Sequence, residues 1–163
     1  MRNDGPVWKA KLKDYYLLMK FTLSFTVVFS SVISYLLVPG VQFDIIQVLS
    51  LFIGGMLVTG SANAINQVVE KDTDALMKRT SSRPVAAGRM SVDEAWTFAG
   101  VAGILGIFLL GGTFNVLTAV IAAFSLFLYG FVYTPLKKVH SIAVLVGAIP
   151  GALPCLIGWV AGT

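Results

Sequence analysis

The sequence predicts an all-α protein, a multi-pass bundle of transmembrane helices, and three observations lead to this prediction. First, 56% of the 163 residues are hydrophobic and only 12% are charged, whereas soluble domains are about 45–50% apolar and about 25% charged. Second, the charges gather in a few segments and leave five apolar stretches between them. Third, Lys and Arg occur only in alternate connections between these stretches.

The five apolar stretches have the length of membrane spans. A spanning helix needs about 17–25 mostly apolar residues, and the backbone must satisfy its own hydrogen bonds in lipid, so helices are the structure to expect. The predicted spans are residues 21–38, 45–69, about 95–110, 116–133 and 142–161, the third being the shortest. We treat residues 1–163 as a single transmembrane domain.

The basic residues orient this bundle. All 12 Lys and Arg residues lie before the first span, after the second or after the fourth, and the connections at residues 39–44 and 111–115 contain none. Because Lys and Arg are enriched in cytoplasmic loops, the N-terminus and both basic connections are predicted to be cytoplasmic.

Two segments outside the spans have predicted roles. Residues 1–20 form a cytoplasmic interfacial segment, because Trp8, Leu12 and Tyr16 recur at helical spacing with lysines between them, as in helices that lie in the plane of a membrane surface. Residues 66–94 form a cytoplasmic catalytic loop region, for reasons given below.

The composition also argues against several classes of protein. Low charge disfavours a soluble enzyme, a disordered segment and a nucleic-acid-binding domain, although the net charge is +4. The single cysteine, Cys155, excludes an internal disulfide framework and a cysteine-rich metal site. We therefore expect the lipid bilayer as a partner and no nucleic acid.

A polar stretch follows the second span. Asn66, Glu70 and Asp74 are four residues apart, so on a helix of 3.6 residues per turn they lie along one face. Two carboxylates and an amide offer hard oxygen ligands, which suit Mg²⁺ that is held together with a substrate phosphate. This stripe predicts a magnesium site, and the alternative is a solvated loop with charges of both signs.

Basic side chains follow the acids and return after the fourth span. Lys78, Arg79 and Arg83 come within ten residues of Asp74, and Tyr133 and Lys137 end the fourth span. A guanidinium pairs bidentately with phosphate, and lysine offers a point charge. These residues predict a diphosphate site, although Lys137 could be an ordinary cytoplasmic anchor and Tyr133 an interfacial belt residue.

The combined pattern resembles the signature of the UbiA superfamily of intramembrane prenyltransferases. The matching positions are Asn66-x-x-x-Glu70-x-x-Thr73-Asp74-x-x-Met77-x-Arg79-Thr80-x-x-Arg83-Pro84. Within the superfamily, the branch that this chain resembles is that of the protoheme IX farnesyltransferases. The runs that carry this resemblance are Asp72-Thr73-Asp74-Ala75-Leu76-Met77-Lys78-Arg79-Thr80 and Tyr133-Thr134-Pro135-Leu136-Lys137-Lys138.

The resemblance implies an Mg²⁺-dependent enzyme that transfers a farnesyl group from farnesyl diphosphate to the vinyl group of heme B, which makes heme O. It implies that Glu70 and Asp74 hold Mg²⁺ and that Asn66 completes the catalytic set. It assigns diphosphate binding to Lys78, Arg79, Arg83, Tyr133 and Lys137. It also implies the inner membrane of a bacterial cell and contact with heme-handling or oxidase assembly proteins.

The chain departs from the family pattern in two respects. Family members resemble a nine-helix bundle with a second aspartate-rich motif on a later helix, and residues 1–163 contain only the first motif. We therefore expect this chain to be inactive alone. In addition, residues 19–22 read Met-Lys-Phe-Thr where the family often reads Thr-Lys-Pro-Arg, so only Lys20 is kept.

Other functions remain open at this point. A UbiA-type prenyltransferase that acts on an aromatic or quinone precursor would carry the same motif. Half of a transporter, or a non-catalytic helical subunit, would also have apolar spans. Transport sites usually lie near the middle of the membrane, whereas these acids are predicted at its cytoplasmic face, which favours the enzyme.

Overall fold

The computed structural model describes residues 5–163, where the regular structure is helical and contains no strand. The helices long and apolar enough to cross a membrane are α3 (Ile45–Val69), α5 (Val92–Thr113), the continuous run Val116–Leu136 and α8 (Ala143–Ala161). A fifth span results if α1 (Val7–Leu18) and α2 (Phe21–Leu36), which meet at a 52° bend, count as one. The predicted all-α, multi-pass bundle is confirmed.

The predicted length of the third span is wrong. The third span, expected at about residues 95–110 and as the shortest, is α5 with 22 residues. It begins earlier because Ser91 caps it: the Ser91 side chain accepts a hydrogen bond from the backbone N–H of Glu94 at 3.0 Å, as in a capping box. The shortest of the four helices that can cross a membrane by themselves is instead α8, with 19 residues. Arg2, one of the basic residues used to orient the bundle, lies outside the described residues.

The bend between α1 and α2 is made at Lys20. Its backbone has a φ of 49°, in the left-handed region that residues other than glycine seldom adopt. The bend leaves the carbonyl of Met19 outside both helices. Ser24 Oγ and Asn63 Nδ2 donate to that carbonyl at 2.7 and 3.0 Å, so side chains from α2 and α3 supply the partners that a helix end needs.

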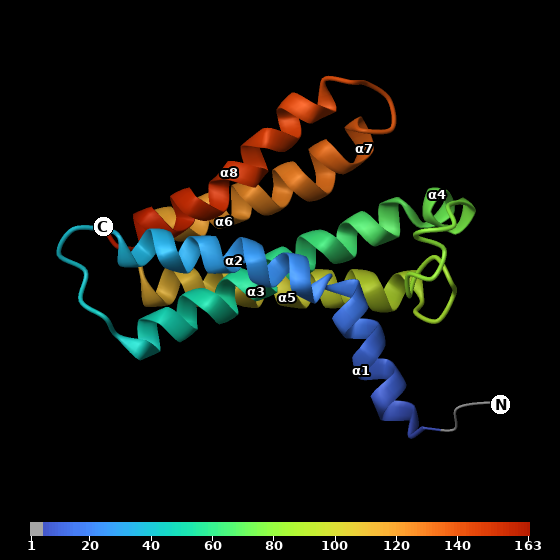
Figure 1. Ribbon diagram of the computed structural model, residues 1–163, viewed down its shortest axis with the longest axis horizontal. Helices are drawn as coiled ribbons and strands as arrows, with labels where there is room; N and C mark the ends of the chain where they lie inside the picture. Colours follow the sequence, from blue (N-terminus) through green and yellow to red (C-terminus); the bar gives the residue numbers. More distant parts are fainter. Residues whose placement is uncertain (1–4) are drawn as a thin grey trace.

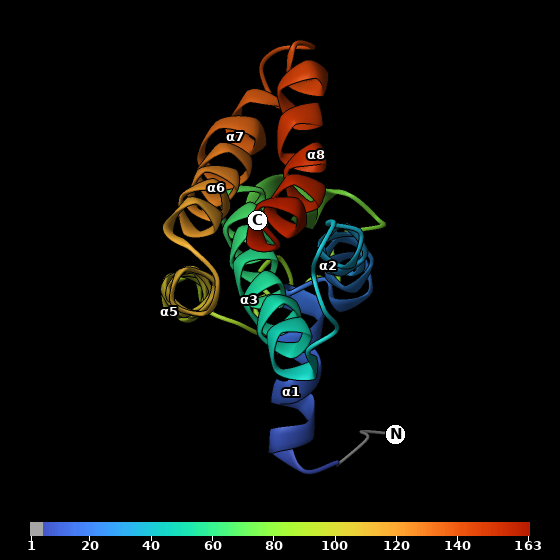
Figure 2. The same cartoon turned by 90° about the vertical axis from the view of Figure 1, so that its left-hand side faces the viewer.

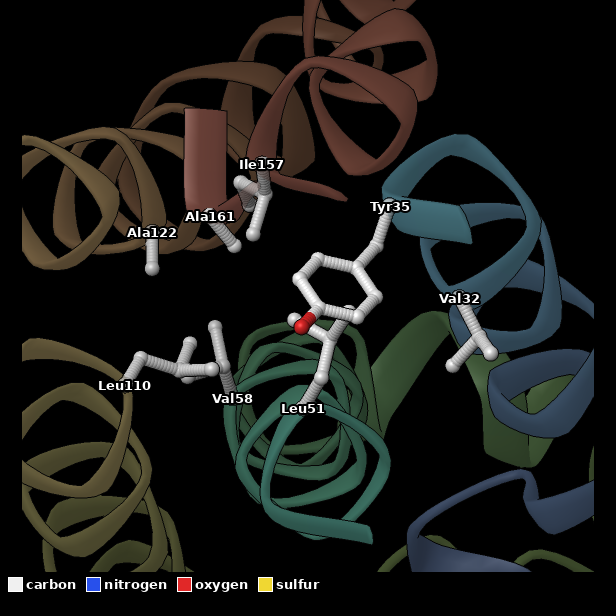
Figure 3. Close-up of a cluster of buried hydrophobic side chains, with 8 residues drawn as sticks. All are labelled: Val32, Tyr35, Leu51, Val58, Leu110, Ala122, Ile157 and Ala161. Carbon is white, nitrogen blue, oxygen red and sulfur yellow. The ribbon is translucent and has the colours of Figure 1, made fainter. Parts of the chain in front are cut away.

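The helices form a bundle around α3. In Figure 2, α5 lies on one side of α3 and α2 on the other, while the antiparallel pair of α6 (Val116–Phe127) and α8 covers a third side. Figure 3 shows the apolar core where these five helices meet. It consists of Val32 and Tyr35 from α2, Leu51 and Val58 from α3, Leu110 from α5, Ala122 from α6, and Ile157 and Ala161 from α8.

The fourth span changes its winding near its end. After α6 the chain forms a π-helical segment, η1 (Leu128–Tyr133), and then one turn, α7 (Thr134–Leu136). Pro135 lacks an N–H, and in an α-helix its ring would clash with the carbonyl four residues earlier. The wider π-helical turn avoids this clash, and Thr134 Oγ1 donates to the Tyr129 carbonyl at 2.7 Å. Pro135 therefore distorts the span without ending it.

Charged segments gather at one end of the bundle, which we call the charged end. It contains α1, α4 (Lys71–Leu76), the loop at residues 77–91 and α7, whereas the C-terminus and the α2–α3 connection lie at the opposite end (Figure 1). Two ion pairs tie α1 to its neighbours there. They are Lys11 Nζ–Glu94 Oε2 and Arg89 Nε–Asp14 Oδ1, both at 2.9 Å.

Candidate active site at the charged end of the bundle

Asn66, Glu70 and Asp74 remain together, although the helix that carries them breaks. α3 ends at Val69, and Glu70 (φ −94°, ψ 6°) separates it from α4. The four-residue spacing persists because the Glu70 N–H donates to the Asn66 carbonyl at 3.0 Å and the Asp74 N–H to the Glu70 carbonyl at 2.7 Å. The three side chains are buried, with 0%, 7% and 4% of their surface exposed, whereas the neighbouring Asp72 is exposed.

Two cations neutralise the buried carboxylates. Arg83 Nη1 lies 2.7 Å from Asp74 Oδ2 and 3.8 Å from Glu70 Oε2, and Lys137 Nζ lies 2.5 Å from Glu70 Oε1. Buried carboxylates need such partners because an isolated charge in the interior is costly. Residues from α4, the 77–91 loop and the end of the fourth span therefore converge on one point.

Lys20 joins this cluster, although the sequence placed it in no site. Its Nζ donates to Asn66 Oδ1 at 3.1 Å, across 46 residues of sequence. The other side of the same amide, Asn66 Nδ2, lies 3.4 Å from the Oγ1 of the fully buried Thr134. The only sequence signal for Lys20 was that it keeps one position of the family pattern at residues 19–22.

Lys78 and Arg79, both predicted diphosphate ligands, are not brought to the acids. Both side chains are exposed, and within the described part of the chain neither forms an ion pair. Arg79 does line a pocket of about 390 Å³ together with Lys20 and Arg83. No carboxylate lines this pocket, so it offers a positive environment beside the acids.

The carboxylates of Glu70 and Asp74 lie close enough together for one cation to be near both. A single nitrogen, Arg83 Nη1, lies within 4 Å of both Glu70 and Asp74, so one cation can contact both acids. Residues 5–163 contain no group of three or more His, Cys, Asp or Glu side chains that could hold a metal. Two carboxylates with waters and a substrate diphosphate are the partners that Mg²⁺ commonly takes in proteins.

An apolar cavity of about 510 Å³ opens beside this cluster. Its walls come from α2, α3, the α6–η1 run and α8. Tyr129 and Tyr133, whose ring centroids are 5.4 Å apart, line the cavity, and Lys137 Nζ lies 5.6 Å from the Tyr133 ring centroid. Leu23 lines both this cavity and the basic pocket, so the two spaces adjoin each other.

The sequence is similar to curated enzymes along almost its whole length. A protein named protoheme IX farnesyltransferase from Flavobacterium psychrophilum is 47% identical over 163 residues, which is 99% of this chain and 54% of that protein. The mitochondrial protoheme IX farnesyltransferase of Yarrowia lipolytica is 42% identical over 161 residues, 99% of this chain and 33% of that protein. The chain thus spans about half the length of the bacterial relative and about a third of the length of the mitochondrial one.

Two solved structures share the fold. A digeranylgeranylglyceryl phosphate synthase matches with a TM-score of 0.82 and 29% identity, over 94% of this chain and 54% of that one. A UbiA homologue from Archaeoglobus fulgidus, solved with GPP and Mg²⁺, matches with a TM-score of 0.72 and 19% identity, over 91% of this chain and 54% of that one. The model of the UbiA prenyltransferase family matches residues 27–163. Since this match covers well over half of the sequence, the chain belongs to the UbiA prenyltransferase family.

Proposed function

We propose that this chain carries the first acidic motif of an Mg²⁺-dependent enzyme that transfers a farnesyl group from farnesyl diphosphate to the vinyl group of heme B, giving heme O. The observation that carries the proposal is the contact of Arg83 with both Glu70 and Asp74, beside an apolar cavity. This arrangement suits a diphosphate with a prenyl tail. The names of the relatives favour farnesyl diphosphate and heme as the substrates.

The charged groups would act on the leaving diphosphate. Mg²⁺, when bound by Glu70 and Asp74, supplies positive charge to the diphosphate as the allylic bond breaks. Arg83 and Lys137, which contact the carboxylates, would then turn to the diphosphate oxygens, where Arg83 can bind bidentately. Lys20 and Arg79 face the same pocket and would add positive charge, so the transition state is stabilised electrostatically.

The apolar cavity would hold the prenyl chain and protect the reacting carbon. Tyr129 and Tyr133 present aromatic rings to this space, and an aromatic face stabilises a nearby cation. With a prenyl chain in place, these apolar walls would also keep water away from the allylic cation, which water would otherwise capture. The terminal vinyl carbon of heme B would then bond to the farnesyl carbon whose C–O bond to the diphosphate breaks. The cation left on the carbon next to the porphyrin ring would take up a water molecule and lose a proton, which gives the hydroxyethylfarnesyl group.

The protein is a multi-pass membrane protein of this family, and we propose the bacterial inner membrane as its location. The positive-inside rule supports a cytoplasmic location for the charged end and the N-terminus. Farnesyl diphosphate would then reach the site from the cytoplasm or the inner leaflet. Contact with heme-handling or oxidase assembly proteins stays a prediction.

An acceptor test decides the proposed function. We define the full-length form as this chain continued by the part of the Flavobacterium psychrophilum relative that it does not cover. In lipid nanodiscs with Mg²⁺ and farnesyl diphosphate, it should convert heme B to heme O, identified by mass spectrometry. An aromatic acid and a quinone precursor serve as comparison acceptors, and prenylation of either one in place of heme B would contradict the assignment.

A further inference from the structure

The apolar cavity narrows at the end away from the charged cluster, and it is open at the side, where Val144 of α8 is exposed. Leu23 lies at its mouth, next to the pocket lined by Lys20 and Arg83, and Pro154 lies at its far end. Beyond Pro154 there is a second, much smaller space of about 40 Å³, little more than the ~30 Å³ that one water molecule takes up in the liquid. A prenyl chain that enters at Leu23 therefore has room in the first space only.

The boundary between the two spaces is formed by residues that line both. We call this boundary the throat, and it consists of Val27 on α2, Val58 and Thr59 on α3, Ser125 on α6 and Pro154 on α8. Thr59 and Ser125 are half-buried, and in the described part of the chain their hydroxyl groups make no hydrogen bond. Their side chains can therefore be replaced without breaking a polar contact.

The throat is narrow because α2 and α8 touch just beyond it. Ser31 Oγ donates to the Pro154 carbonyl at 2.6 Å, and a Cβ at Gly158 would collide with the Ser31 carbonyl oxygen. An α-helix rises about 1.5 Å per residue, so Ser31 lies about 12 Å deeper along α2 than Leu23. The depth of the cavity is thus set by a backbone contact rather than by a mobile side chain.

We propose that the throat sets the length of the prenyl donor, because the last isoprene unit of the chain rests against Val27, Thr59 and Ser125. This inference rests on the proposed function in that it places a prenyl chain in the cavity, but it does not depend on which acceptor is used. Pockets of this kind discriminate by space: one methylene more or less in an apolar pocket changes specificity by roughly 10–200-fold.

Variants that fill or open the throat test this proposal. Thr59→Leu and Ser125→Leu fill it from opposite walls, and Val27→Ala opens it toward the smaller space. The matched control is Thr26→Leu, next to Val27 on α2 but exposed and outside both spaces. Each is made in the full-length form. The donors are geranyl, farnesyl and geranylgeranyl diphosphate, each one isoprene unit longer than the one before.

Two measurements read out donor length. One is the ratio of kcat/KM values between donors, and the other is displacement of labelled farnesyl diphosphate by each donor in the presence of Mg²⁺ and without an acceptor. We expect both filling variants to shift the ratio at least tenfold toward geranyl diphosphate and Val27→Ala to shift it toward geranylgeranyl diphosphate. The control should keep the ratio of the unsubstituted protein.

The outcomes separate this proposal from the choice of acceptor. If heme B is not prenylated but displacement shows the expected shifts, the acceptor is wrong and the throat assignment stands. If all three throat variants keep the donor ratio within twofold while remaining monodisperse, or if the unsubstituted protein binds no prenyl diphosphate, the throat does not set donor length.

Discussion

Arg83 reaches back across nine residues to Asp74, with its Nη1 2.7 Å from Asp74 Oδ2. The pair joins the 77–91 loop to α4 at the point where Glu70 and Lys137 also meet. The guanidinium therefore lies against the carboxylates that would hold a metal ion in the proposed reaction. Metal and diphosphate should consequently bind together, since Arg83 would have to give up the acids to a metal ion and would find a new partner in the diphosphate.

Asp74→Ala should abolish farnesyl transfer in the full-length form. Loss of one metal ligand leaves diphosphate charge uncompensated in a water-poor site, and removal of a single stabilising group in such a site costs about 3 kcal/mol, or more than a hundredfold in kcat. The measurement is heme O formation at saturating Mg²⁺. Asp72→Ala is the matched control, because Asp72 is exposed. Near-normal turnover by Asp74→Ala would remove Asp74 from the site.

Arg83→Lys should be damaging although it keeps the charge. The planar guanidinium of arginine can bind a carboxylate or a phosphate with two parallel hydrogen bonds, whereas the ammonium of lysine is a point charge and cannot. We expect kcat/KM for farnesyl diphosphate to fall at least tenfold, equivalent to about 1.4 kcal/mol. Arg89→Lys, which alters a partly buried ion pair with Asp14 in α1, should change the value far less. Equal effects of the two substitutions would show that Arg83 has only a structural role.

Lys20→Met should weaken donor binding. Lys20 lies beside Asn66 and lines the basic pocket with Arg79 and Arg83, so its loss removes one of the three cations that line this pocket. We expect the KM for farnesyl diphosphate to rise several-fold, with the KM for heme B unchanged. Lys13→Met is the control, since Lys13 is exposed and outside that pocket. A rise in the KM for heme B alone would assign Lys20 to the acceptor instead.

Gly158→Ala should destabilise the bundle. A Cβ there would collide with the backbone of Ser31, and overpacking of this kind costs about 1–3 kcal/mol. The expected result is a lower Tm in nanodiscs. Gly100→Ala on α5 has open space around it and replaces glycine with a better helix former, so its Tm should be unchanged or higher. If both variants have the same Tm, α2 and α8 are not in fixed contact.

The 163-residue chain alone should form no heme O from farnesyl diphosphate, Mg²⁺ and heme B. It contributes two carboxylates to the proposed metal site, and the resemblance to the family implies that a second acidic motif shares the neutralisation of the diphosphate. Co-expression with the remaining part of the Flavobacterium psychrophilum relative should restore activity, because helical bundles can assemble from separate pieces. Efficient turnover by the chain alone would mean that a second motif is dispensable.

The sequence by itself determined the helical architecture and the composition of the acidic stripe. Apolar stretches of spanning length predict helices because lipid offers the backbone no other partner, and the four-residue spacing of Asn66, Glu70 and Asp74 predicts one shared face. That spacing survived a break in the helix at Glu70, because hydrogen bonds four residues apart continue through it. These features are local, so a single segment is sufficient to specify them.

Only the tertiary structure decided which distant residues complete the site. Lys20 donates a hydrogen bond to Asn66, 46 residues away in the sequence, and Ser31 donates one to Pro154, 123 residues away. No periodicity of the sequence predicts either contact. The first depends on the left-handed turn at Lys20, and the second on Gly158, which lets α8 approach α2 closely. Conversely, Lys78 fits the charge pattern but is exposed, because spacing specifies the face of a helix and cannot specify where the loop after it turns.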